Sequence, residues 1–108
     1  MELVSLSEAP AHDPERFVAA ELLEGALTNV RIIRLGAGQA LPPHTHAPSE
    51  LMLYAVEGDA ELDTDDGTVP FPAGTLARFD GEDELRVSNA GDAPVTLLAF
   101  LAPPFPPR

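Results

Sequence analysis

The sequence predicts an all-β fold, either a sandwich or a closed barrel. Short apolar or alternating runs recur along the chain, and turn-forming residues interrupt them about every eight to twelve residues. The interruptions include Asp65-Asp66-Gly67, Pro72-Ala73-Gly74 and Asn89-Ala90-Gly91-Asp92, which combine residue types that stabilise turns. Short strands with such turns between them are typical of β-sandwiches and β-barrels.

The N-terminal part, residues 1–26, is expected to form an arm or an edge strand. Residues 1–14 mix apolar and turn residues around Pro10 and Pro14, and we expect His12 to lie at the surface. The segment 14–23 is the one stretch that could be helical, although Phe17-Val18 favours a strand. One helical turn at most is therefore predicted in this part.

The central part, residues 27–102, contains the predicted barrel strands. The first covers 27–35, and the second is the apolar run within 50–57. Five more are predicted at 59–63, 68–71, 75–79, 84–88 and 94–101. The last part, residues 103–108, is proline-rich and cannot continue a sheet ladder, because proline lacks the backbone donor. We expect Phe105 in this tail to pack on the barrel or on a dimer partner.

Composition and charge narrow the function classes. The chain has 108 residues and no cysteine, which predicts one domain without disulfides or thiolate chemistry. Its 18 acidic and 6 basic residues give a net charge of -12, which repels phosphate backbones and argues against nucleic-acid binding. No apolar run approaches the roughly 20 residues of a membrane span, so we expect a cytoplasmic protein with no membrane partner.

The segment Pro42-Pro43-His44-Thr45-His46 is the strongest functional signal. It holds two of the three histidines of the chain. Side chains two residues apart on an extended segment point to the same face, so His44 and His46 are expected side by side. Neutral imidazole is a common metal ligand, and this pair therefore predicts a candidate metal site.

These residues resemble the cupins. Gly38, His44-Thr45-His46 and Gly58 are similar to the first motif of that family, and the segment from Gly74 to Asn89 is similar to the second. The resemblance implies a double-stranded β-helix, or jelly-roll barrel, with a metal site. Two of the family's ligands are replaced, however. The third histidine falls on Leu85, or on Ala77 if Pro72-Ala73-Gly74 is aligned with the second motif, and the acidic ligand falls on Leu51, with Glu50 one residue too early.

Three states of the site follow from these departures. A β-bulge could turn Glu50 inward, so that His44, His46 and Glu50 form a two-histidine, one-carboxylate triad typical of non-haem iron sites. Alternatively, Glu50 points outward, because a shift of one residue reverses the face of a side chain, and metal binding is weak or absent. In the third state a nearby polar residue replaces the missing ligand; the candidates are Gln39, Asp80 and Glu82.

Two functions of different class are therefore predicted. The first is a binding protein whose barrel pocket takes a small apolar or aromatic molecule against Leu51, Leu53 and Leu85, with the metal site partly lost. The alternative is a metal-dependent cupin enzyme, a dioxygenase or isomerase, that uses His44, His46 and Glu50 to hold Fe, Mn, Ni or Zn. In both cases the resemblance and the apolar end segments suggest a homodimer.

Overall fold

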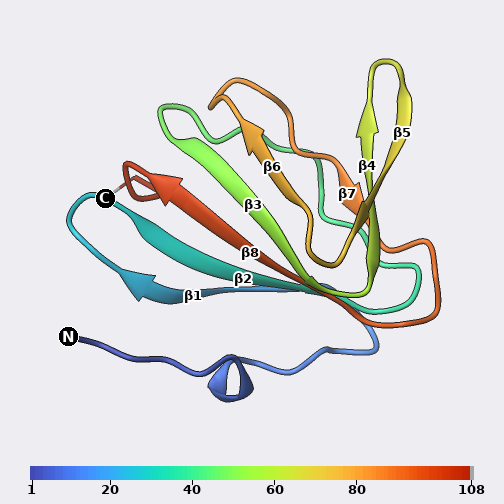
Figure 1. The fold of residues 1–108 in the computed structure, drawn as a ribbon, viewed down its shortest axis with the longest axis horizontal. Coiled ribbons are helices and arrows are strands. Elements are labelled where there is room, and N and C mark those ends of the chain that lie inside the picture. The colour runs from blue at the N-terminus through green and yellow to red at the C-terminus, as the bar shows by residue number, and fades with distance from the viewer. Residues whose placement is uncertain (108) are drawn as a thin grey trace.

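The protein consists of two antiparallel β-sheets that face each other (Figure 1). This computed structural model describes residues 1–107. The larger sheet has five strands, in the order β1 (Val18–Glu24), β2 (Asn29–Leu35), β8 (Val95–Ala102), β3 (Glu50–Glu57) and β6 (Leu76–Phe79). The smaller sheet has three strands, in the order β5 (Gly67–Pro72), β4 (Asp59–Thr64) and β7 (Val87–Ser88). The all-β prediction is confirmed.

The hydrophobic core lies between the two sheets. Strand β3 shows how the sequence builds it, because Leu51, Leu53 and Ala55 are fully buried while the residues between them are exposed or half-buried. Alternation with period two places one set of side chains inside and the other outside. Phe71 of β5 and Leu97 of β8 contribute large buried side chains to the same cluster.

The structure decides the ambiguous segment of the N-terminal part. The segment 14–23, which was ambiguous between helix and strand, contributes most of β1, and β1 pairs with β2 from Val18 opposite Arg34 to Glu24 opposite Asn29. Sheet hydrogen bonds to β2 decide its conformation, because local helical preference is a weak determinant beside tertiary pairing. The one helical turn among residues 1–107 is the 3₁₀ turn Leu6–Glu8.

The expectation that His12 is a free surface side chain is wrong. His12 is half-buried, and its Nε2 lies 2.9 Å from the carbonyl oxygen of Val95. Nearby, Arg34 donates to the carbonyl oxygens of Pro10 and Leu6, both at 2.8 Å. These contacts tie residues 1–14 to the larger sheet, below which the arm runs in Figure 1.

The predicted strand at 84–88 is shorter than expected. Only Val87–Ser88 pairs with β4, while Leu85 forms an isolated bridge with His44. The strand is shortened because Leu85 pairs with the histidine segment and not with the smaller sheet.

No helix among the described residues is long and apolar enough to cross a membrane.

Candidate functional site

The two histidines are held by backbone pairing with the loop that precedes β7. His44 and Leu85 exchange both backbone hydrogen bonds, at 3.4 and 2.8 Å, and the amide of His46 donates to the carbonyl oxygen of Gly81 at 2.9 Å. The segment is therefore extended, and both side chains line the same cavity. Their ring centroids are 4.3 Å apart, which confirms that the two imidazoles lie side by side.

His46 is a buried histidine without a hydrogen-bond partner at one ring nitrogen. It is 4% exposed, and among the described residues its Nδ1 has no partner. Its ring meets the rings of His44 and Phe105 edge to face, with a centroid distance of 5.0 Å to Phe105. Burial, together with the neighbouring His44, lowers the pKa of His46 from 6.5 to about 4. His46 is therefore a neutral imidazole at pH 7.

The cavity beside this pair has a volume of about 290 Å³. Its wall comes from the inner faces of β1, β2 and β8, from the histidine segment and from the C-terminal tail. The lining is mainly apolar, with Arg31, His44 and His46 as its nitrogen-bearing side chains. The other lining residues are Phe17, Ala19, Ile33, Leu41, Pro42, Leu85, Ala99, Leu101, Phe105 and Pro106.

The tail closes one side of the cavity through Asn29. The buried Asn29 amide donates to the carbonyl oxygen of Phe105 at 2.6 Å and accepts from the Phe105 backbone amide at 3.0 Å. The Asn29 side chain therefore satisfies both backbone hydrogen-bonding groups of Phe105, as a neighbouring strand does in a sheet. The Phe105 ring packs against the core cluster and against His46, so the tail packs on its own barrel.

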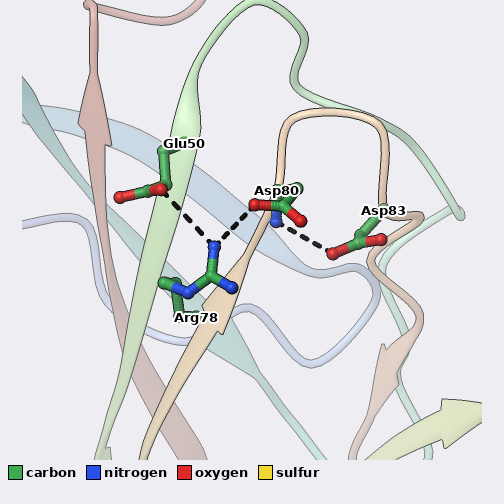
Figure 2. Close-up of polar contacts among 4 residues, drawn as sticks. All are labelled: Glu50, Arg78, Asp80 and Asp83. Atoms are coloured by element: carbon green, nitrogen blue, oxygen red, sulfur yellow. Dashed lines mark hydrogen bonds and ion pairs between the residues drawn. The ribbon is translucent and has the colours of Figure 1, made fainter.

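The structure does not bring Glu50 to the two histidines. Glu50 is exposed, and its carboxylate lies 3.4 Å from Arg78, which also donates to Asp80 at 2.6 Å (Figure 2). Strand β3 does contain a register shift, between Ala55 and Glu57. It nevertheless leaves Leu51 buried, in the place that the resemblance gives to the acidic ligand, and Glu50 on the outer face.

Of the three leucines that were predicted to contact a ligand, only one lines the cavity. Leu85 lines the cavity, whereas Leu51 and Leu53 are not among its lining residues and are 0% exposed. Both belong to the packed core between the sheets. The open space instead lies beside β1, β2 and β8, where Ala19 of β1 and Ala99 of β8 contribute small side chains to the lining.

The side chains near the two histidines do not fit a three-ligand metal site. Gln39 is engaged by the amide of Gly36 and the carbonyl of Asp13, and Asp80 is bound to Arg78. Within residues 1–107, no three His, Asp or Glu side chains are placed to share one ion. Catalytic zinc sites usually have three protein ligands, and here two imidazoles are present.

Sequence reasoning missed two residues that line the cavity, Arg31 and Phe17, and it missed Asn29, which holds the lining residue Phe105. Arg31 could have been found, because it has the same strand parity as Ile33 and Leu35 and places a charge on that inner face. Phe17 directly precedes β1, in a segment that the sequence left ambiguous between helix and strand. Asn29 carried no local signal, since its partner Phe105 is 76 residues away.

The lowered pKa of His46 predicts acid sensitivity. Between pH 6.5 and about 4 the unfolded chain gains a proton at this residue and the folded chain does not, so the free energy of unfolding falls as the pH falls. The full contribution of such a shift is about 3 kcal/mol. We expect His46→Phe, which keeps an aromatic ring, to remove it. Urea unfolding of both proteins at several pH values measures the difference, and a difference that stays constant from pH 7 to 4 would contradict this account.

Comparison with known proteins identifies the fold. The family model described as a cupin domain matches residues 31–101. An RmlC-like cupin protein from Desulfovibrio desulfuricans has 30% identity and a TM-score of 0.84, with 97% of this chain and 99% of that chain covered. The protein TT1209 from Thermus thermophilus has 23% identity and a TM-score of 0.81, with 96% and 99% covered.

A third similar structure is an uncharacterized conserved protein with a double-stranded β-helix domain from Klebsiella pneumoniae. Its identity is 20% and its TM-score 0.84, with 94% of this chain and 84% of that chain covered. At these lower identities the likeness concerns the fold alone. No curated protein matches the chain.

Proposed function

Since this chain belongs to the cupin family, we propose that its barrel cavity binds a small, mainly apolar or aromatic molecule. The observation that carries this proposal is the cavity of about 290 Å³ bounded largely by apolar side chains. Small-molecule sites are usually concave and apolar, with a few polar groups that orient the ligand. Here Arg31, His44 and His46 are those polar groups.

The state of His46 allows it to form a hydrogen bond to such a ligand. A neutral imidazole can donate or accept a hydrogen bond, and its Nδ1 has no partner among residues 1–107. A buried polar atom without a partner costs about 1–3 kcal/mol. Phe105 and Phe17 line the cavity and offer ring contacts to an aromatic ligand.

Thermal-shift titration with small aromatic and aliphatic compounds tests the proposal. A compound at 100 times its dissociation constant should stabilise the protein by about 2.7 kcal/mol. We expect Ala19→Phe to abolish the shift, because Ala19 lines the cavity from an exposed position on β1, where a larger side chain fills space without disturbing the core. Ala73→Phe, at an exposed turn outside the cavity, is the matched control. Equal shifts in both variants would contradict the proposal.

A metal-dependent activity at His44 and His46 is the second candidate. The ring separation of 4.3 Å supports it, and the exposed Glu50 weakens it. In the same assay, titration with Fe, Mn, Ni and Zn salts should stabilise the protein only if the two imidazoles bind an ion. Loss of that shift in His44→Ala but not in Glu50→Ala would support a site without the carboxylate, and loss in both would restore the triad.

We also propose a homodimer. The outer face of the larger sheet exposes Met52, Leu76 and Phe100, with Leu76 70% exposed. These residues lie on the adjoining strands β3, β6 and β8, so they form one apolar surface that a second copy could cover. Light scattering decides between this arrangement and a monomer.

A further inference from the structure

Arg31 projects into the cavity from the inner face of β2. It lies directly opposite Glu21 on β1 and Ala99 on β8, and it lines the cavity together with Ile33 and Leu101. Among the described lining residues, Arg31 is the one permanently charged side chain, because arginine remains protonated at all ordinary pH values. An apolar cavity therefore has a fixed positive charge in its wall.

The guanidinium of Arg31 has unused hydrogen-bonding capacity. Its one ion pair joins Nη1 to Glu21 at 3.5 Å, and within residues 1–107 no hydrogen bond to it is found. Arg34, three residues later, differs because it donates to Pro10, Leu6 and Thr96. Arginine has five N–H donors in a planar fork that matches a carboxylate. Arg34 thus has a structural role, whereas Arg31 still has donors for a ligand.

Glu21 holds this guanidinium in place. The Glu21 carboxylate accepts a hydrogen bond from Asn29 at 2.8 Å, and Asn29 is 1% exposed and also binds Phe105. The Arg31 side chain is 27% exposed, so its charge is partly shielded from water. A group that is oriented and partly desolvated interacts more strongly with an opposite charge than an exposed one.

We propose that the cavity selects carboxylates: molecules with an aromatic or aliphatic body and one carboxylate, which binds Arg31. This inference rests on the proposed function and adds the ligand class. The body lies against Ile33, Leu85 and Leu101, and the carboxylate accepts hydrogen bonds from the guanidinium donors that Glu21 does not use. The net charge of -12 does not prevent binding, because charges farther than about 8 Å are largely screened at physiological salt.

Matched acids and amides test this ligand class. Phenylacetate and hexanoate, both ionised at pH 7, are compared by titration calorimetry with phenylacetamide and hexanamide, which have nearly the same shape without the charge. Hydrogen bonds to a charged group contribute about 1.5–3 kcal/mol, so each acid should bind about ten- to a hundredfold more tightly than its amide.

Two double variants test whether the preference for acids over amides depends on Arg31. The double variant Arg31→Met with Glu21→Gln is the decisive protein, because it removes both charges of the ion pair at the cavity, and it should bind acids and amides equally. Arg78→Met with Glu50→Gln removes a comparable ion pair from the outer face and should keep the preference.

The outcomes separate this inference from the proposed function. If wild-type protein binds the amides as tightly as the acids, or if the Arg31→Met/Glu21→Gln protein keeps the preference, the carboxylate assignment is wrong while the apolar pocket stands. If neither the acids nor the amides bind, both the assignment and the proposed pocket fail.

Discussion

Replacing Gly58 with alanine is expected to destabilise the protein by about 4 kcal/mol, from a strained backbone and an overlap in the same place. Gly58 joins β3 to β4 with a φ of +82°, a conformation that side chains with a Cβ rarely adopt. An added Cβ would also overlap the carbonyl oxygen of Pro94 and reach within 3.0 Å of Val95 Cγ2. Backbone atoms on both sides would have to move.

Gly74→Ala is the matched control for this prediction. Gly74 has a similar φ of +89°, but an added Cβ would meet no atom within 4 Å. Its cost should be that of the backbone conformation alone, about 1–2 kcal/mol. Urea unfolding of the two variants separates the contributions, and equal losses would show that contact with Pro94 does not constrain the turn.

Asn29→Ala is expected to cost about 3 kcal/mol and to open the cavity, since three hydrogen bonds of a buried amide are lost. The tail would no longer be joined to β2, and the Phe105 ring would lose its contact with His46. Affinity for cavity ligands should fall together with stability, because Phe105 forms part of the wall. Urea unfolding and ligand titration measure the two effects.

A double-mutant cycle shows whether Asn29 acts through the tail. If it does, Phe105→Ala should add much less to the loss of stability in the Asn29→Ala protein than it does in the wild type, because residues in contact are energetically coupled. Strict additivity of the two losses would mean that Asn29 stabilises the sheet independently of Phe105.

Much of the fold was predictable because its signals are local. Turn residues such as Asp65-Asp66-Gly67 separate the strands, and alternation in β3 places Leu51 and Leu53 inside. The pair of histidines on one face follows from the same period of two. The strand β1 was ambiguous because its conformation depends on pairing with β2, and pairing between strands is not encoded by local preference.

The direction of Glu50 shows where local signals end. Strand parity favoured an outward side chain, yet a bulge could have reversed it. The structure does contain a register shift in β3, at Ala55 to Glu57, but Glu50 remains on the outer face with Arg78. Cross-strand pairing with β6, which sets Met52 opposite Arg78, brings that arginine beside the carboxylate.

The sequence by itself determined an all-β barrel of the cupin type and a His44–His46 pair on one face, since both depend on residues close together in the chain. Only the tertiary structure decided what surrounds that pair. Arg31, Leu85 and Phe105 meet the histidines around one cavity because strand register and the Asn29 contact with the tail bring distant segments together. Such contacts arise from packing between elements, and no short stretch of sequence specifies them.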